Sequence, residues 1–264
     1  MIIYRTQEEI ALIRKSSQIA ALILAELKEL IRPGVMTKEL DEYAEARVKS
    51  FGAKPAFKGY RGFPASLCTS INEEIVHGIP SSRRLKEGDI ISLDFGVYYN
   101  GYYGDAAVTY PVGQISSLAQ RLIETAERAL YYGLEKVRVG NRISDISHAI
   151  QTFVESQGFS VIRAFVGHGI GQALHEEPQV PNFGPPGRGT LIKPGLTLAI
   201  EPMISAGDWR EEILNDGWTA VTRDRSLAAH FEHTVVATDK GVEILTLVPE
   251  KQESEELRME VRRA

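Results

Sequence analysis

Apolar side chains recur at every third or fourth position between residues 6 and 31, the spacing that gives a helix one buried face. Thr6 and Glu9 make the capping-box pattern of a helix start, and Pro33 followed by Gly34 stops the helix. A second, shorter helix is predicted over residues 37–50. The chain therefore begins with two helices joined by a short turn.

Strands are predicted after these two helices. Residues 63–76 have the composition of short strands, interrupted by turns at Pro64 and Asn72. Residues 89–98 and 102–110 are two apolar runs on either side of a glycine-containing turn, which is the pattern of a long β-hairpin. The first half of the chain is thus a helix pair followed by antiparallel strands.

The second half of the chain repeats this plan. Helices are predicted over about residues 117–137 and 145–156, and strands follow them. Glycines that close the helices recur at the same separation in both halves: Gly34 and Gly52 in the first, Gly140 and Gly158 in the second. The order of elements and the glycine spacing both indicate an internal repeat.

A longer match supports the repeat. The segment LKEGDIISLD, residues 85–94, aligns without gaps with IKPGLTLAIE, residues 192–201. One such match could arise by chance, because a Lys-x-Gly turn before an apolar strand is common, but matches in two places at nearly one offset favour a duplication. Two pseudo-symmetric halves would then present Asp94 and Glu201 from the same strand position, at a shared interface where binding sites tend to form.

Composition narrows the class of protein only a little. The chain has 264 residues, 43% hydrophobic and 25% charged, which is ordinary for a globular protein of one large domain or two smaller ones. A net charge of −5 argues against general nucleic-acid binding. Cys68 is the only cysteine, so no intrachain disulfide can form, and no secretory signal or membrane-spanning stretch is visible. We expect a cytoplasmic protein.

Two aspartates in the predicted hairpin are the first candidates for chemistry. Asp94 ends the apolar run IISL, and Asp105 follows the turn onto the next strand. Acids in apolar strands are costly to bury unless they are paired or bound to a cation, and two on neighbouring strands repel each other, so a metal ion is the natural counter-charge. In the alternative, Asp94 caps a turn before Gly96 and Asp105 lies in solvent. This stretch alone does not decide between them.

Further acids and histidines occur in comparable places. Glu201 closes the apolar run TLAI, and Glu232 shares a predicted strand face with Thr234. His168 lies in the glycine-rich sequence VGHGIG, although a lone histidine is more often structural than a ligand. His175, in LHEEP, could equally be an ordinary loop residue.

Four carboxylates and one imidazole make a hard, oxygen-rich donor set: Asp94, Asp105, Glu201, Glu232 and His168. Such a set suits two manganese, iron(II) or cobalt ions better than a thiolate-bound structural zinc. Two dications would balance the four negative charges, and two ions ~3.5–4 Å apart can activate water and polarise a carbonyl group. The chemistry that this donor set predicts is hydrolysis.

Six stretches around these residues match one known family: CTSINEEIVHGIP at 68–80, LDFG at 93–96, GHGIG at 167–171, HEEP at 175–178, AIEPM at 199–203 and EHTV at 232–235. The chain resembles the methionine aminopeptidases of type I in their bacterial short form, over roughly residues 3–247. The resemblance implies an α+β pita-bread fold with two pseudo-symmetric halves around a curved antiparallel sheet and helices outside. It places a single catalytic domain at residues 1–249 and leaves a charged tail at 250–264.

The resemblance also implies an activity, which is removal of the initiator methionine from nascent proteins with a small second residue. Two divalent metal ions, cobalt, manganese or iron, would activate the attacking water. The partners would be N-terminal methionine peptides and nascent chains, and a transient association with the ribosome would suit this task. We expect a cytoplasmic monomer that binds neither membranes nor nucleic acid directly.

Roles for the metal ligands follow from the same resemblance. Asp94 would bind one metal ion and His168 the other, while Asp105 and Glu232 would bridge the two. Glu201 would bind metal and act as the general base that passes a proton from water to the leaving amine.

The resemblance assigns the substrate contacts as well. His175 would bond the scissile amide and help the tetrahedral intermediate, and His77 would contact the peptide beyond that bond. The methionine pocket would be formed by Tyr60, Phe63, Cys68, Leu174 and Trp218. Bulky walls around a flexible thioether are suited to selecting methionine. A monovalent cation is also implied, near the carbonyl groups of Asn72, Glu74 and Ala228.

Three residues depart from the family pattern, and none is a predicted metal ligand. Arg61 occupies a loop position that often holds histidine or glycine, Leu174 replaces a frequent aromatic residue, and His230 stands where glutamine is more usual. Leu174 could change the preferred side chain, and His230 could act on the surroundings of the metal.

Two other classes of function remain as alternatives. A non-catalytic binding protein of the same fold would be expected to have lost metal ligands, yet all five are present. A proline-specific peptidase of this fold would usually carry a large additional N-terminal domain, for which a first helix starting near residue 6 leaves no room.

Overall fold

The computed structural model describes residues 1–249, so the predicted charged tail at 250–264 lies outside the described residues. These residues contain four α-helices close to their predicted positions: α1 (Gln7–Lys28), α2 (Thr37–Ser50), α3 (Ser117–Leu134) and α4 (Ile143–Ser156). The predicted capping box starts α1, since the Thr6 hydroxyl accepts the Glu9 amide (3.3 Å) and the Glu9 carboxylate accepts the Thr6 amide (2.9 Å). None of the four helices has the length and apolar run that crossing a membrane requires.

The strands fall into two groups around α3 and α4. Those before α3 are β1 (Lys54–Pro55), β2 (Cys68–Ile71), β3 (Glu74–Val76), β4 (Ile90–Tyr99) and β5 (Tyr102–Pro111), with a 3₁₀ turn at Tyr60–Gly62. Those after α4 begin with β6 (Ser160–Val161), β7 (Gly167–Gly169), β8 (Glu176–Val180), β9 (Thr197–Ile200) and β10 (Met203–Ser205). The remainder are β11 (Glu211–Ile213), β12 (Ala220–Thr222), β13 (Ala228–His230), β14 (Glu232–Thr238) and β15 (Gly241–Ile244).

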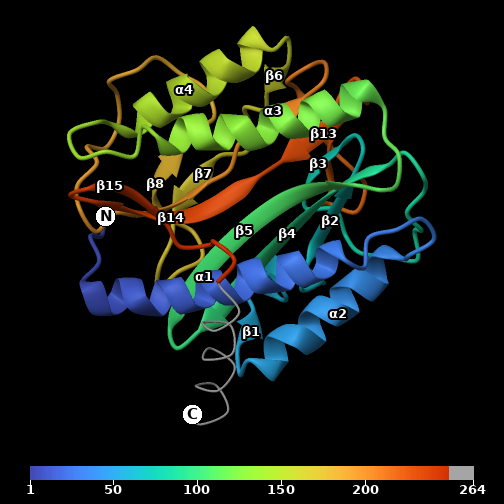
Figure 1. Ribbon diagram of the computed structural model, residues 1–264, viewed down its shortest axis with the longest axis horizontal. Helices are drawn as coiled ribbons and strands as arrows, with labels where there is room; N and C mark the ends of the chain where they lie inside the picture. The colour runs from blue at the N-terminus through green and yellow to red at the C-terminus, as the bar shows by residue number, and fades with distance from the viewer. Residues whose placement is uncertain (250–264) are drawn as a thin grey trace.

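One curved antiparallel sheet of nine strands runs through the whole molecule. Its main path is β1-β4-β5-β14-β9-β7-β8, with β2 paired to β4 and β15 paired to β14 (Figure 1). Two small three-stranded sheets, β13-β10-β6 and β11-β12-β3, flank it. Because β5 of the first half pairs directly with β14 of the second, both halves share the main sheet, and we infer one domain over residues 1–249.

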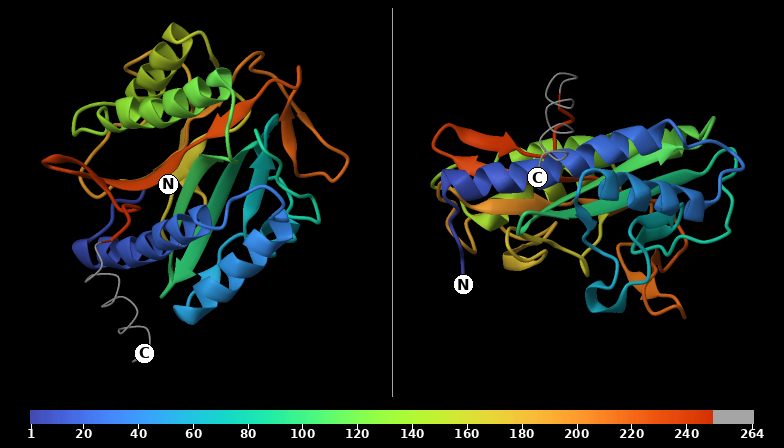
Figure 2. Two further views of the ribbon diagram at one scale, coloured as in Figure 1. Left: turned by 45° about the vertical axis from the view of Figure 1, so that its right-hand side comes forward. Right: turned by 90° about the horizontal axis from the view of Figure 1, so that it is seen from below.

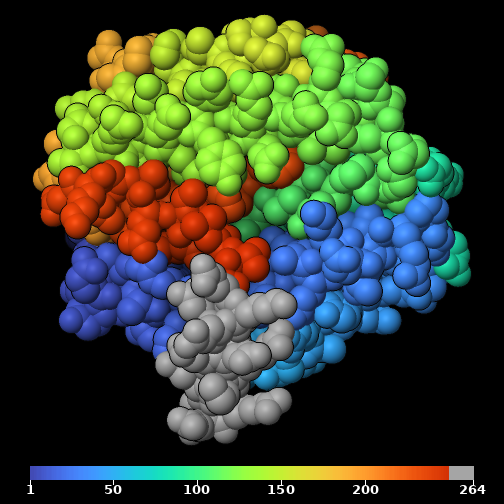
Figure 3. All heavy atoms as spheres, viewed as in Figure 1, coloured from blue at the N-terminus to red at the C-terminus, as the bar shows by residue number. Residues whose placement is uncertain are grey.

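All four helices cover the same face of this sheet. The right-hand view in Figure 2 shows the helices on one side of the sheet and the long connecting loops on the other. On the helical face, α1 and α2 form one block and α3 and α4 form another, with the C-terminal strands exposed as a band between them (Figure 3). The predicted α+β fold, with two halves around a curved sheet and helices outside, is confirmed.

Matching backbone hydrogen bonds in the two halves show the duplication in three dimensions. The Gly34 amide donates to the Leu85 carbonyl (2.8 Å), and the Gly140 amide donates to the Ile192 carbonyl (3.2 Å). Both glycines have positive φ angles, +92° and +94°, a conformation that glycine adopts without strain. Leu85 and Ile192 are the residues that the sequence repeat aligned, so the same turn is built twice.

Each half also buries its own helix pair against the sheet. The cluster under α1 and α2 includes Ile23, Leu27, Leu40 and Phe95. The cluster under α3 and α4 includes Leu122, Leu130, Ile146 and Leu198. Each fully buried side chain of this size contributes roughly 1.5–3 kcal/mol, so the two clusters hold the helices to the sheet and leave its other face for the loops.

The short strands predicted within 63–76 form only from Cys68 onward, because residues 63–67, which include the predicted turn at Pro64, form a loop before β2 begins. Pro64 has no backbone N–H to give to a sheet. The amides of Ser66 and Leu67 instead donate to the carboxylate of Asp41 on α2, at 2.8 and 2.9 Å. A side chain from a distant helix has replaced the neighbouring strand as the hydrogen-bond acceptor.

Candidate metal centre

Strand register places the predicted ligands in two adjacent rows on one face of the main sheet. In the first row, Asp94 lies opposite Ala107 of β5, and Ala107 lies opposite Glu232 of β14. Glu201 directly follows β9, in the register that continues this row beside Glu232. Three carboxylates from strands far apart in the sequence are thereby aligned.

The second row lies two residues further along each strand and therefore faces the same side. Asp105 lies opposite Gly96, while His168 lies opposite Ala199, which in turn lies opposite Thr234. The Thr234 hydroxyl accepts the amide of Asp105 (2.9 Å) and joins the two parts of the row. The sheet thus carries Asp105 and His168 next to the first row.

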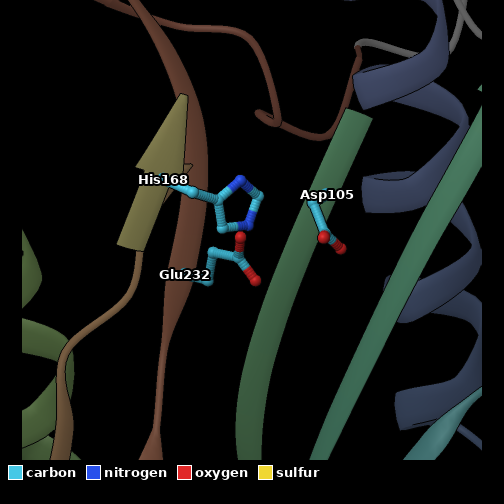
Figure 4. A group of neighbouring side chains, drawn as sticks. All are labelled: Asp105, His168 and Glu232. Carbon is cyan, nitrogen blue, oxygen red and sulfur yellow. The ribbon is translucent and has the colours of Figure 1, made fainter. Parts of the chain in front are cut away.

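Asp105, His168 and Glu232 form the tightest group of side chains. One ligating atom of each lies within 4.8 Å of the others, and Figure 4 shows that the three side chains come from different strands. All three residues are buried, with exposed fractions of 4%, 6% and 2%. Around them, Glu201 Oε1 lies 3.5 Å from His168 Nε2, and the carboxyl group of Asp94 is a close neighbour of that of Asp105.

Burial raises the pKa of all four carboxyl groups. The pKa values of Asp94, Glu201 and Glu232 lie well above the ordinary range, first because of burial and then because neighbouring carboxylates repel one another. Burial raises the pKa of Asp105 to about 7. A bound cation would reverse the effect, because a nearby positive charge favours the ionised carboxylate.

His168 presents a lone pair to the site. Its Nδ1 lies 2.8 Å from the carbonyl oxygen of Gly169, which can only accept a hydrogen bond, so Nδ1 carries the proton and Nε2 is free to bind a metal ion. Burial lowers the pKa of His168 to about 4, which keeps the ring neutral at physiological pH. A neutral imidazole is the form that binds metal.

The residues present fit a divalent cation. Among residues 1–249, two buried carboxylate oxygens of the site have no hydrogen-bond partner: Oδ1 of Asp94 and Oε1 of Glu232. Buried polar atoms are nearly always bonded, so unpaired acid oxygens beside a free imidazole nitrogen indicate the position of a bound cation. Oxygen and imidazole donors in this ratio suit manganese, iron or cobalt.

His230 and His168 lie near different carboxylate oxygens of Glu201. The Nε2 of His230 is 3.7 Å from Glu201 Oε2 and has no hydrogen-bond partner among residues 1–249. Burial lowers the pKa of His230 to about 3, so its ring is neutral. The histidine that replaces the more usual glutamine therefore contacts the carboxylate of Glu201.

A cavity of about 150 Å³ adjoins the carboxylates. It is lined by all five predicted ligands and by the predicted substrate residues Tyr60, Phe63, Cys68, His77, Leu174, His175 and Trp218. This volume is smaller than the ~300–1,000 Å³ of clefts that enclose drug-sized ligands. The cavity is suited to one side chain, with the rest of a peptide leaving through its mouth.

Aromatic contacts fix the two histidines at the cavity. His175 stacks on Tyr60 with ring centroids 5.3 Å apart, and its Nδ1 lies 2.8 Å from the Tyr60 hydroxyl. The His175 and His168 rings are 4.3 Å apart. His77 meets Trp218 edge-on at 6.3 Å. Burial lowers the pKa of both His77 and His175, to about 3 for His175, so both rings can donate or accept as neutral groups.

Phe57 also lines the cavity, and the sequence did not identify it. The ring lies against Gly96, where an added Cβ would come within 2.6 Å of it. Phe57 precedes Tyr60 by three residues in the loop that supplies two other aromatic walls, and that proximity is the one signal that could have found it. The glycine after Asp94 therefore makes room for a wall of the cavity.

The sequence matches the model of metallopeptidase family M24 over residues 11–239. It is 55% identical over 248 residues to methionine aminopeptidase 1 of Bacillus subtilis, an alignment that covers 94% of this chain and 100% of that relative. It is 52% identical to a methionine aminopeptidase of Clostridium perfringens, again over 94% and 100% of the two chains. The crystal structure of methionine aminopeptidase from Thermotoga maritima has a TM-score of 0.92 and 47% identity, and the match covers 93% of this chain and 99% of that one.

Proposed function

Since this chain belongs to metallopeptidase family M24 and within it to the methionine aminopeptidases of type I, we propose that it removes the initiator methionine from nascent proteins with a small second residue. One observation carries the proposal at the level of residues. A site for divalent metal and an aromatic cavity for one side chain lie side by side, and two neutral histidines, His77 and His175, line the same cavity.

Five side chains would hold the metal. We propose two ions, of cobalt, manganese or iron. Asp94 and His168 would each bind a separate ion, Asp105 and Glu232 would bind both, and Glu201 would be a ligand that also transfers protons. When bound, the ions lower the pKa of the attacking water and polarise the scissile carbonyl group.

The chain's own groups would move the proton and orient the peptide. Glu201 would take a proton from the attacking water at a carboxylate oxygen and deliver it to the leaving amine. His175, held by Tyr60, would hydrogen-bond the scissile amide as charge develops on its oxygen, and His77 would contact the peptide beyond the bond. The aromatic walls would exclude water from the methionine side chain.

We propose a site for a monovalent cation as well. A monovalent cation near Asn72, Glu74 and Ala228 is supported by the proximity of two of these residues, since the Ala228 amide donates to the Asn72 carbonyl (2.8 Å). We also propose that the enzyme works in the cytoplasm as a monomer and meets nascent chains there, in transient association with the ribosome.

Release of free methionine from Met-Gly-Met tests the function. Purified protein with added Co²⁺ or Mn²⁺ should cleave it, and a chelator should lower the rate at least ~100-fold, because several kcal/mol of stabilisation come from the metal. Leu-Gly-Met should be cleaved about 10- to 200-fold less efficiently, the usual limit for small apolar differences. Methionine release that ignores the chelator would contradict the metal mechanism. Cleavage of Xaa-Pro peptides alone would favour a proline-specific peptidase. Binding of Met-Gly-Met without cleavage would favour a non-catalytic binding protein.

Arg61 should tune the preference for residues further along the substrate. Its exposed guanidinium lies 5.4 Å from the Tyr60 ring centroid, and Arg61 lines the same cavity as the buried carboxylates, so we expect a longer peptide to pass close to it. We expect Met-Gly-Asp peptides to be cleaved roughly two- to fivefold more efficiently than Met-Gly-Lys peptides at low salt, the range of exposed ion pairs. Arg61→Gln should abolish this preference and Arg61→Lys should keep it. If the ratio of kcat/KM for Met-Gly-Asp and Met-Gly-Lys peptides is unchanged in Arg61→Gln, Arg61 does not determine this preference.

A further inference from the structure

Arg5 is a charged residue buried against a distant part of the chain. Its side chain is only 1% exposed, and arginines are rarely buried to that degree unless they are paired. Nη2 donates to both carboxylate oxygens of Glu176, at 2.6 Å for Oε1, and Nη1 donates to Glu9 (3.3 Å). Arg5 therefore ties the segment before α1 to the start of β8.

The backbone holds this segment in place as well. The Arg5 amide donates to the Gly195 carbonyl (2.8 Å), at the turn that precedes β9. In the right-hand view of Figure 2, the N-terminal segment leaves the start of α1 and runs toward the side of the sheet that carries the loops. The N-terminal segment thus reaches the side of the sheet that carries the loops, although the helix that follows it covers the opposite face.

Glu176, which accepts from Arg5, belongs to a tight turn between β7 and β8. The Glu176 carboxylate also accepts the Ala173 amide (3.0 Å), and the Gly171 amide donates to the Ala173 carbonyl (3.1 Å). Gly171 packs directly on the guanidinium, because a Cβ added there would collide with Arg5. One face of the turn at 171–176 is therefore shaped around the arginine.

This turn carries His175 into the cavity. His168 precedes it on β7 and His175 is its last residue before Glu176, so the position of Glu176 fixes the backbone from which the His175 ring extends. A planar guanidinium can bond both oxygens of one carboxylate and still reach a second acid, which a lysine ammonium group cannot do with the same fixed geometry. The contact is suited to setting an orientation.

We propose that Arg5 is a positioning residue for catalysis: its guanidinium holds Glu176 and the turn at 171–176, and thereby sets the place of the His175 ring. This inference rests on the proposed function, in which His175 contacts the scissile amide. A misplaced His175 would weaken an interaction that matters most in the transition state, so kcat should change more than KM.

A double-mutant cycle tests the proposal. In the metal-loaded enzyme, Arg5→Ala should lower kcat for Met-Gly-Met about 10- to 100-fold, in the range expected for a small misplacement of a catalytic group, while KM changes less than about threefold. In a His175→Ala background, Arg5→Ala should cost less than about twofold, because the residue through which it acts is gone. Equal losses in the two backgrounds would overturn the proposal and make Arg5 an ordinary structural residue.

Two further variants separate positioning from folding. Arg14→Ala removes another arginine near the N-terminus, one that pairs with Glu243 at a partly exposed site, and should leave kcat unchanged. Arg5→Lys keeps the charge and should recover part of the lost kcat. If Arg5→Ala fails to fold, Arg5→Lys takes its place in the cycle, with a smaller loss in wild type and the same absence of loss beside His175→Ala.

Hydrogen exchange gives a readout that needs no substrate. The Ala173 amide, which donates to Glu176, should exchange faster in Arg5→Ala than in wild type, whereas amides in the core of β4 should not change. Unchanged exchange at Ala173 would overturn the proposed contact. A wild-type protein that released no methionine would instead refute the proposed function, and exchange at Ala173 would still decide whether Arg5 holds the turn.

Discussion

Glu201→Gln should lower kcat for Met-Gly-Met by about 10²–10⁴-fold, the range that positioned proton transfer contributes. Glutamine has nearly the shape of glutamate but cannot take a proton from water or return one to the leaving amine. The remaining ligands, Asp94, Asp105, His168 and Glu232, are unchanged, so the variant should still bind metal. The chemical step should suffer far more than substrate binding, and KM should stay within a few-fold of wild type.

The measurement is kcat together with metal content and thermal unfolding of the same sample. Glu177→Gln is a matched control, since it changes an exposed glutamate two residues from His175 by the same single oxygen-to-nitrogen exchange. It should keep the wild-type rate. A Glu201→Gln enzyme with wild-type kcat would mean that another group is the base, and loss of bound metal would mean that Glu201 acts chiefly as a ligand.

Metal removal should make the folding stability fall steeply with rising pH. In the metal-free protein the pKa values of Asp94, Glu201 and Glu232 lie well above those of the unfolded chain, and that of Asp105 is about 7, all chiefly because of burial. The folded state then holds more protons than the unfolded state, so raising the pH favours unfolding. The stability that these protonated carboxyl groups contribute is complete below about pH 4 and is lost as the pH rises through their pKa values in the folded state.

The effect of the carboxyl groups is best measured above about pH 7, where histidines are neutral in both the folded and the unfolded state. The histidines His168, His175, His230 and His233 have lowered pKa values, about 4 or 3, so their opposite effect on stability is confined to lower pH. Each carboxyl group that keeps its proton only in the folded state should lower the free energy of unfolding by about 1.4 kcal/mol per pH unit.

Urea unfolding between about pH 7 and 8.5, with a chelator or with excess Mn²⁺, checks this expectation. The metal-loaded protein should show a much smaller slope, because bound cations keep the carboxylates ionised in the folded state as well. Glu232→Gln should flatten the slope of the metal-free protein, since glutamine resembles the protonated acid. If the free energy of unfolding of the metal-free protein stays level or rises over this range, the four acids must already have a counter-charge or be exposed to solvent.

The sequence determined the elements and the chemistry of the site. Helical spacing and the capping box at Thr6 set the start and the buried face of α1, because these signals act within a few residues, whereas the helix ends at Lys28, before the predicted stop at Pro33 and Gly34. The repeat of residues 85–94 at 192–201 reveals two halves before any contact is known. The acids themselves are visible as polar interruptions of apolar runs, so the donor set, and with it the expectation of metal, follows from residue type and position.

Only the tertiary structure decided between the two interpretations of Asp94 and Asp105, as metal ligands or as exposed turn residues. Asp94 could have capped an exposed turn, but pairing of β4 with both β2 and β5 places it inside the sheet, opposite Ala107 and in line with Glu232. His233 is adjacent to Glu232, yet alternation turns it to the other face, where it contacts Tyr131 of α3 and Thr246. Neighbours in sequence are separated by the sheet, and residues far apart are joined by it.

The same holds for the residues that the sequence did not identify. Phe57 becomes a wall of the cavity because Gly96, on another strand, leaves space for its ring. Arg5 contacts the turn that carries His175 through Glu176, which lies 171 residues further along the chain. Local pattern encodes helices, strands and candidate ligands, since those depend on spacing along the chain. Register between distant strands and contacts across them depend on how the whole chain packs, and no short stretch of sequence contains that information.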